Sequence, residues 1–363
     1  MKKKVRIKDI ALYSKGTQIN GDELLEEAKF DYLNGGIKPS GKWDNANCVA
    51  NTVTISEGGN SCGYVNFMKN PFWCGAHCYF LYDTKIDSKY LYYALKSQQV
   101  RIMKLRSGAC MPNIKKTDLG NFEFVCDDNS IEQKKITHIL DKLEYVIEQR
   151  KNEIQVFDEL VKARFVEMFG EEKNKVKMVD ICSIITDGTH ESPKFVNEGI
   201  PFIFVSNISD NKIMYDADKY IDKATYDVLI KRTPIEIGDI ILSTVGSYGH
   251  PAVVKSDKKF LFQRHIAYLK PKREMVNSEY LHTMIMMDYV QHQINLEVKG
   301  IAQKTLNLSA IKSLDVLMPS LSQQNEFAFF KIQVDKSKLP NISIIYTLFV
   351  GMTYTLPGTL ALY

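Results

Sequence analysis

The feature that most constrains this chain is a stretch without proline or glycine that runs from Ser130 to Phe169. Apolar residues recur in it with heptad spacing, which is typical of a helix that packs along one narrow stripe. The stripe consists of Ile136, Leu140, Leu143, Ile147, Ile154, Phe157 and Val161. The spacing predicts one helix over residues 130–170, about 60 Å long at 1.5 Å per residue. Two interpretations stay open: the helix packs on its own domain or, as we expect, pairs with another long helix.

The segments on either side of this helix resemble each other, which indicates an internal duplication. Residues 88–91 (SKYL) correspond to residues 278–281 (SEYL), at a nearly constant offset from the neighbouring matches. The other matching pairs are residues 5–10 with 176–181, 56–63 with 243–249, and 114–125 with 306–317. The chain therefore follows the order domain, helix, domain, start of a second helix.

Each copy combines short β-type runs, separated by Gly, Asn and Ser turns, with helical stretches. We predict an α+β fold of two similar, β-rich domains separated by long helices. The expected boundaries are residues 1–129 for the first domain, 130–170 for the spacer helix, 171–320 for the second domain, 321–339 for the start of a second spacer helix, and 340–363 for an atypical tail.

Composition narrows the class of protein only a little. The 363 residues include 47 Lys and Arg and 43 Asp and Glu, so a net charge of +4 neither requires nor excludes nucleic acid. Seven cysteines are an odd number for a disulfide framework, and the N-terminal segment has no apolar core typical of a secretory signal. No apolar run reaches the length of a clear membrane span. We therefore expect a cytoplasmic protein.

Several segments, in the same order in both copies, resemble the specificity subunit of type I restriction–modification systems. In the second copy these are residues 185–194 (ITDGTHESPK), 199–202 (GIPF), 238–243 (GDIILS) and 262–265 (FQRH). In the first copy they are residues 34–41 (NGGIKPSG) and 63–66 (GYVN). The resemblance covers about residues 5–339, and its specificity lies in the order of the segments, twice, around a heptad helix.

The resemblance implies two target-recognition domains, each of which reads one half of a split DNA sequence. It also implies two antiparallel spacer helices, two methyltransferase subunits and two restriction subunits as partners. The chain itself would be non-catalytic and hold no cofactor, since S-adenosylmethionine, ATP and Mg would belong to the partners. A spacer of about 60 Å corresponds to roughly 17 base pairs, an upper limit for the gap between half-sites.

Candidate DNA contacts are polar or basic residues on loops and helix ends. In the first copy they are Lys38, Ser40, Lys42, Trp43, Asn45, Asn60, Arg101, Lys104 and Arg106. In the second copy they are Thr189, His190, Ser192, Lys194, Tyr248, Arg264, Lys299 and Lys304. For each group the alternative is structural: an ordinary surface loop, a tight turn, or a solvated helix end.

Two other classes of function compete with this hypothesis. A DNA-modifying enzyme, an adenine methyltransferase or a nuclease, would carry its own site, but residues 70–73 (NPFW) lack the second proline of the methyltransferase box. A coiled-coil scaffold would bind unrelated duplexes equally. Cys62, Cys74, His77 and Cys78 could bind zinc, but alternation of residues 74–80 favours a buried strand, and we expect no metal.

The C-terminal tail departs from the expected heptad pattern. Pro340 is predicted to stop the second helix, and residues 339–363 contain no Asp, Glu, Lys or Arg. Three interpretations stay open: a foreign or out-of-frame ending, which we favour, an apolar segment that docks on a partner, or a membrane insertion. A truncated second helix would leave the stripe from Ile154 to Val161 partly uncovered and promote self-association.

Overall fold

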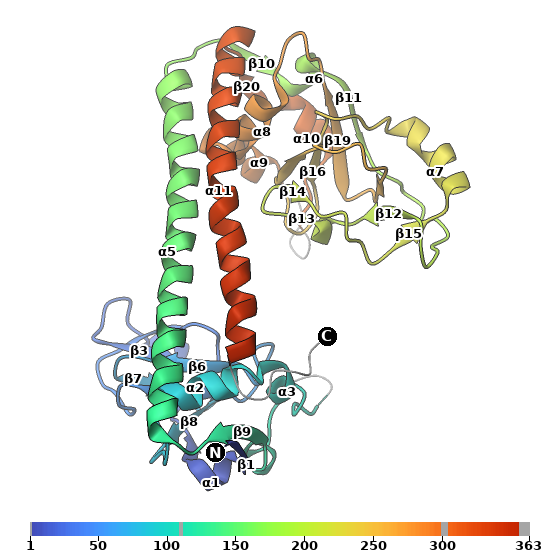
Figure 1. The fold of residues 1–363 in the computed structure, drawn as a ribbon. Helices are drawn as coiled ribbons and strands as arrows, with labels where there is room; N and C mark the ends of the chain where they lie inside the picture. Colours follow the sequence, from blue (N-terminus) through green and yellow to red (C-terminus); the bar gives the residue numbers. More distant parts are fainter. Residues whose placement is uncertain (1, 109–111, 299–303, 356–363) are drawn as a thin grey trace. The chain divides into compact units, whose positions relative to one another are not determined.

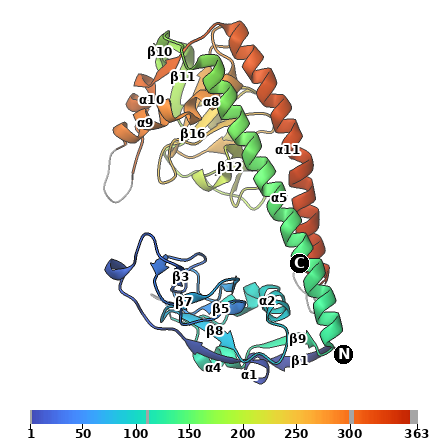
Figure 2. The same cartoon turned by 90° about the vertical axis from the view of Figure 1, so that its left-hand side faces the viewer.

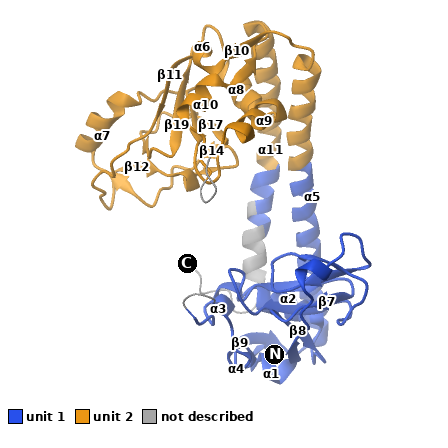
Figure 3. Ribbon diagram, turned by 180° about the vertical axis from the view of Figure 1, so that it is seen from behind, with its two compact units in different colours: residues 1–153, 341–363 blue, residues 154–340 orange. Residues whose placement is uncertain are grey.

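We describe a computed structural model of the chain, which covers residues 2–108, 112–298 and 304–355 (Figure 1). The chain divides into two compact units (Figure 3). Unit 1 comprises residues 1–153 and 341–363, and unit 2 comprises residues 154–340. The boundaries fall inside two long helices, α5 (Ser130–Phe169) and α11 (Leu321–Thr355). The single long helix that the heptad spacing predicts is thereby confirmed.

Unit 1 is built on a four-stranded antiparallel sheet in the order β2-β8-β5-β6. Its strands are β2 (Leu12–Lys15), β8 (Cys78–Tyr82), β5 (Thr52–Ser56) and β6 (Val65–Met68). Every residue of β5 is buried, and the helix α2 (Ser88–Lys96) packs against β5 and β6. This arrangement gives unit 1 an apolar core of its own.

Smaller elements complete unit 1. A three-stranded sheet has the order β4-β3-β7, in which β3 (Phe30–Leu33) pairs antiparallel with β4 (Gly41–Trp43) and parallel with β7 (Phe72–Cys74). A two-stranded ribbon joins β1 (Lys2–Arg6) to β9 (Glu123–Asp127). The short helices are α1 (Ile7–Ile10), α3 (Gln99–Met103) and α4 (Lys116–Gly120).

Unit 2 repeats this topology. Its four-stranded sheet has the order β11-β19-β16-β17 and its three-stranded sheet the order β15-β12-β18, again with one parallel pair, β12 with β18. The strands are β11 (Cys182–Asp187), β19 (Ile266–Pro271), β16 (Ile240–Ser243), β17 (Pro251–Val253), β15 (Tyr220–Ile221), β12 (Ile200–Ile203) and β18 (Leu261–Phe262). The predicted duplication and the α+β class are confirmed.

The remaining elements of unit 2 also have counterparts in unit 1. The ribbon of β10 (Lys175–Lys177) with β20 (Asp315–Leu317) matches β1 with β9, and α8 (Ser278–Met286) packs on β17 as α2 packs on β6. The other helices are α6 (Met178–Ile181), α7 (Lys223–Leu229), α9 (Asp288–Glu297) and α10 (Leu308–Ser313). A small hairpin of β13 (Ile208–Ser209) and β14 (Lys212–Ile213) is particular to unit 2 among the described residues.

The first half of α5 packs on its own unit rather than serving only as a helix-pairing stripe. Leu140 is fully buried against Tyr93 of α2, and the two helices lie side by side in Figures 1 and 2. The Tyr93 hydroxyl donates a 2.6 Å hydrogen bond to Asp141. Burial, helped by that carboxylate, raises the pKa of Tyr93, so the hydroxyl stays protonated. The helix begins at Ser130, as the sequence predicts, and Asn129 caps it, since Asn129 Oδ1 accepts from Ile131 N at 2.9 Å.

The second half of α5 pairs with α11 inside unit 2. Arg164 contacts Glu326 at 3.2 Å and Lys338 contacts Asp158 at 2.6 Å, which fixes an antiparallel pairing. Four rings join the helices to α8, with centroids 5.0–6.4 Å apart. They belong to Phe165, Phe169, Tyr280 and Phe327. Both interpretations of the stripe are therefore correct, each for one half of the helix.

The predicted stop at Pro340 is wrong, because α11 continues through this proline to Thr355. A proline removes one main-chain donor and costs about 3 kcal/mol within a helix, which a helix packed along its first half tolerates. Val161 is buried against the unit 2 core, with Phe157 packed on it. Val161 is therefore covered, whereas Ile154 and Phe157 at this end of the stripe stay partly exposed. Self-association stays a prediction. No helix among the described residues has the length and apolar content to cross a bilayer.

Candidate nucleic-acid interface

In unit 1, the ends of four strands meet at one corner. The unit 1 corner comprises residues 15–18 at the end of β2, 34–36 after β3, 57–61 after β5, 75–77 before β8, and 112–114. Main-chain hydrogen bonds hold these segments together. They run from Thr17 N to Cys74 O, Glu57 N to His77 O, Gly63 N to Ser56 O, and Ile114 N to Glu57 O, at 2.8–2.9 Å.

Unit 2 contains the same frame. The unit 2 corner comprises residues 187–190, 244–246, 263–265 and 304–306. Its hydrogen bonds run from Thr189 N to Phe262 O, Thr244 N to His265 O, Gly249 N to Ser243 O, and Leu306 N to Thr244 O, at 2.8–3.0 Å. Each bond has its counterpart in unit 1, so the two corners share one main-chain scaffold.

Two glycines make the close approach possible. A Cβ on Gly16 would lie 1.8 Å from the carbonyl oxygen of Cys74, and a Cβ on Gly188 would lie 2.3 Å from that of Phe262. Both distances are far shorter than a van der Waals contact, so no other residue fits without moving a strand. Glycine is therefore required at the same point of both corners.

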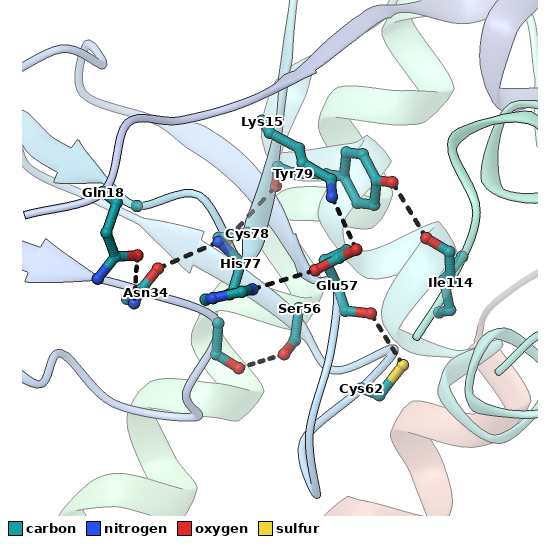
Figure 4. A network of polar contacts seen from close by, with 12 residues as sticks. Lys15, Gln18, Asn34, Ser56, Glu57, Cys62, His77, Cys78, Tyr79 and Ile114 are labelled. Atoms are coloured by element: carbon teal, nitrogen blue, oxygen red, sulfur yellow. Dashed lines mark hydrogen bonds and ion pairs between the residues drawn. The ribbon is translucent and has the colours of Figure 1, made fainter. Parts of the chain in front are cut away.

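Side chains of the unit 1 corner form a polar network, drawn in Figure 4. Glu57, nearly buried, accepts a 2.7 Å hydrogen bond from Lys15 and lies 3.3 Å from Nδ1 of His77. Asn34 accepts from the His77 amide at 3.1 Å and donates to Gln18 at 3.1 Å. The result is a rigid surface on which the imidazole of His77 is exposed.

The unit 2 corner uses a different set of side chains. Asp187, whose side chain is mostly buried, accepts from Arg232 and lies 2.8 Å from Nε2 of His190. Asp187 occupies the strand position of Lys15. Asp187 pairs with Ala267 and Lys15 pairs with Tyr79, and each of these partners is the second residue of a strand that directly follows a histidine. The frame is thus repeated while the charge at this position is reversed.

The predicted loop residues of the first copy lie beside the unit 1 corner. Lys38, Ser40, Lys42 and Asn45 are exposed around β4. Trp43 packs edge-on against Trp73, with centroids 6.4 Å apart, and Trp73 Nε1 donates to Thr17 O. This contact ties the loop to the corner.

The other predicted residues of unit 1 separate into two kinds. Asn60 belongs to the corner and is exposed, as are Lys104 and Arg106 on the segment that follows α3. Arg101 is engaged elsewhere: its guanidinium donates to Gln98 at 2.6 Å and stacks over Phe122. Arg101 is therefore better explained as a structural residue.

In unit 2, Thr189, His190, Arg264 and Lys304 all lie in the corner. Arg264 N donates to Thr189 O, and Lys304 O accepts from Gly246 N. Ser192 and Lys194 are exposed on the loop that leaves the corner. Tyr248 instead packs on the core and donates to Asn295. Lys299 lies outside the described residues.

Sequence analysis missed the side chains that organise the corners. They are Lys15, Gln18, Asn34, Glu57 and His77 in unit 1, and Asp187 and Arg232 in unit 2. A signal was present, because Gly-Thr recurs at residues 16–17 and 188–189 directly after β2 and β11. The charge reversal beside it, Lys15 against Asp187, concealed the match.

The cysteines considered as zinc ligands are engaged in packing. Cys48, Cys74 and Cys78 share one buried apolar cluster, and contact with the other two thiols, together with burial, raises the pKa of the Cys74 thiol. Cys62 donates to Glu57 O, away from that cluster. Among the described residues, no three potential ligands lie close enough to hold a metal ion.

With the fold and both corners in view, comparisons with known proteins decide the family. The model of the type I restriction modification DNA specificity domain matches residues 2–156 and again residues 170–341. The chain belongs to this family. Its two matches fall on the two copies of the fold, so each unit carries one such domain.

Individual relatives agree with the assignment. A protein of Mycoplasma genitalium described as a type I specificity subunit is 37% identical over 145 residues, which is 39% of this chain and 38% of that protein. The specificity subunit of the Escherichia coli type I restriction enzyme EcoBI is 28% identical over 131 residues, 36% of this chain and 27% of that protein. The matched region thus spans well under half of each relative.

Among solved structures, the type I restriction–modification S subunit from M. genitalium has a TM-score of 0.60 to this chain. The alignment covers 100% of this chain and 97% of that one, at 20% sequence identity. At that identity the likeness concerns the fold, and the fold extends over the whole chain.

Proposed function

We propose that this chain is the DNA specificity subunit of a type I restriction–modification complex, in which each unit reads one half of a bipartite target. The observation that carries the proposal is one main-chain frame, repeated in both units, with different outward side chains. Two readers of different half-sites need a common support and different contacts. The double match to the specificity-domain family supports the same conclusion.

Within each corner we assign two kinds of contact. Exposed basic and hydroxyl groups on the surrounding loops suit phosphates: Lys38, Ser40, Lys42, Lys104, Arg106, Ser192, Lys194 and Lys304. Side chains on the rigid frame suit base edges, since reading requires fixed geometry: Asn60, Thr189, His190 and Arg264. Trp43 supports the loop that carries Lys42.

The partners we propose are double-stranded DNA, two methyltransferase subunits and, in the full nuclease, two restriction subunits. The chain directs their chemistry and performs none, so S-adenosylmethionine, ATP and Mg would bind to the partner subunits. A complex that methylates the cell's own DNA would work in the prokaryotic cytoplasm, at the nucleoid, and we place it there.

A map of methylated adenines tests the proposal. Cells that express the chain with its cognate methyltransferase should gain methylation at one split motif, which is absent without the chain. A double variant of the unit 2 corner, Thr189→Ala with Arg264→Ala, should degrade one half of the motif and leave the other intact. Methylation that ignores sequence, or loss of both halves together in a folded variant, would refute independent reading by two units.

A further inference from the structure

Each corner exposes one histidine that is held by a carboxylate lying beneath it. The His77 side chain is 61% exposed, whereas that of Glu57 is 11% exposed. The His190 side chain is 52% exposed, whereas that of Asp187 is 16% exposed. A cation also pairs with each carboxylate: Lys15 with Glu57 in unit 1, and Arg232 with Asp187 in unit 2.

The carboxylate determines which ring nitrogen carries the proton. An ionised carboxylate only accepts hydrogen bonds, so the nitrogen facing it must donate. In His77 this nitrogen is Nδ1, which leaves Nε2 for a ligand; in His190 it is Nε2, which leaves Nδ1. In the neutral imidazole the outward nitrogen is then an acceptor.

The exposed ring of His77 is also fixed through its main chain. Its amide donates to Asn34, and its carbonyl accepts from the Glu57 amide at 2.9 Å. Gly75 permits this arrangement, because a Cβ there would lie 2.2 Å from Asn34 Oδ1. A surface side chain anchored at three points loses little entropy when it binds, as a base-reading group requires.

The two histidines do not occupy equivalent positions. His190 follows β11, where unit 1 has Gln18 after β2, whereas His77 precedes β8, where unit 2 has His265 before β19. The same grouping of imidazole, buried carboxylate and cation has thus been built twice from different positions. If the grouping served only packing, the two histidines would be expected at equivalent positions of the two units. A chemical task that both corners share explains why the same three groups occur together at different positions.

We infer that His77 and His190 are base-reading residues, one for each half-site, and that Glu57 and Asp187 are positioning residues that fix their tautomers. Each outward acceptor nitrogen takes a hydrogen bond from an exocyclic amino group of adenine or cytosine in the major groove. A phosphate is a poorer ligand, since an acceptor nitrogen above a carboxylate repels it. This inference rests on the proposed function and names the chemistry that its site reads.

The test uses the chain assembled with its methyltransferase, read by the methylated-adenine map. His77→Ala should lower discrimination roughly tenfold at one base pair of one half-site, the effect of losing one base contact. His190→Ala should do the same in the other half-site. The wild-type base at each affected position should be adenine or cytosine on the strand contacted. His138→Ala, which removes an exposed histidine from α5, is the matched control and should leave the motif unchanged.

Positioning by the carboxylate has its own signature. The amide of glutamine can both donate and accept a hydrogen bond, so in Glu57→Gln either tautomer of His77 can form. This variant should broaden the base preference at the position that His77→Ala affects and leave other positions intact. In the wild-type chain, nitrogen-15 NMR should report the proton on Nδ1 of His77 and on Nε2 of His190. If Glu57 had only a structural role, Glu57→Gln would lower the free energy of unfolding and leave the base preference at every position of the motif unchanged.

The outcomes separate the two levels of the argument. If the wild-type complex methylates a split motif and His77→Ala and His190→Ala keep it at full stringency, base reading by histidine is refuted while the proposed function stands. Relaxation of the same half-site by both variants, or the opposite NMR tautomers, also refutes the inference. If the wild-type complex yields no split motif, the proposed function fails first.

Discussion

The two corners have the same main chain and different chemistry. Both are held by matching amide-to-carbonyl bonds and both require a glycine after the first strand of the larger sheet. At the next position inward, unit 1 has Lys15 beside Glu57, whereas unit 2 has Asp187 beside Arg232. The comparison teaches that the duplicated part of this molecule is its hydrogen-bonded frame, and that charged side chains on the frame, such as Lys15 and Asp187, have diverged.

The strongest way to break the comparison is to put a methyl group into each frame. Gly16→Ala and Gly188→Ala should each destabilise their own unit by about 3 kcal/mol or more, since the new Cβ overlaps a strand carbonyl. Hydrogen exchange, read by mass spectrometry for each unit, measures the effect.

Gly59→Ala and Gly246→Ala are the matched controls. Both glycines have φ of +73°, and no described atom lies within 4 Å of the added Cβ. These variants should cost only about 1 kcal/mol, from the backbone conformation. Equal losses in controls and test variants would mean that close approach does not hold the corners together.

The attachment of each unit to its long helices sharpens the comparison further. Unit 2 buries Lys331 of α11 between Glu279 and Asp335, whereas unit 1 uses the Tyr93 hydroxyl on Asp141. Lys331→Met should cost about 2–3 kcal/mol, because it leaves buried carboxylates short of a partner. Tyr93→Phe should cost about 1–2 kcal/mol. Denaturant unfolding checks both, and a larger loss for Tyr93→Phe would contradict the ranking.

Acid should affect unit 2 before unit 1. Burial lowers the pKa of His282 to about 4, with Lys331 and Lys255 adding to the shift and Glu279 opposing it. The unfolded chain therefore binds a proton near pH 6.5 that the folded unit binds only near pH 4, so stability falls as the pH drops through this window. We expect about 1–2 kcal/mol by pH 5.

Two carboxylates extend this acid sensitivity. Burial raises the pKa of Glu279 and Asp335, but neighbouring ammonium groups together outweigh it and both pKa values are lowered: Lys331 acts on both carboxylates, Lys255 on Glu279 and Lys338 on Asp335. Their contribution is present above the ordinary carboxylate pKa and is lost as the pH falls through the lowered values. Hydrogen exchange at pH 7 and pH 5 should show faster opening in unit 2, and His282→Gln should reduce the difference between units. Faster opening of unit 1 would contradict the assignment.

The smallest effect should come from two basic residues. Lys304→Ala, in the unit 2 corner, should weaken DNA binding by the complex and lower its salt dependence by about one ion. Arg101→Ala should leave both unchanged, since that guanidinium is held by Gln98 and Phe122. Binding titrations at several salt concentrations compare the DNA affinities of the two variants. Equal losses of affinity would mean that Arg101 also contacts DNA.

The sequence predicted the duplication, the long helix and most loops near the corners because these depend on local periodicity and turn residues. It did not predict that α11 continues beyond Pro340. The cost of a proline in a helix is visible in the sequence, whereas the packing of Phe327 and Val334 on the unit 2 core, which stabilises this helix, is not. It also missed Glu57 and Asp187, whose roles arise from strands that meet only in the folded unit. Lone polar residues in a strand-rich sequence carry no signal of such a meeting.

The main-chain origin of the corner frame has an evolutionary consequence. Because amides and carbonyls hold the strand ends together, mutations of the outward side chains leave the principal folding interactions in place. With the proposed function, a lineage under pressure from changing foreign DNA could therefore acquire a new target by a few substitutions. In such a protein, a change of target need not lower the stability of the fold. The glycines that allow the strands of the frame to approach are the positions where substitutions should accumulate most slowly.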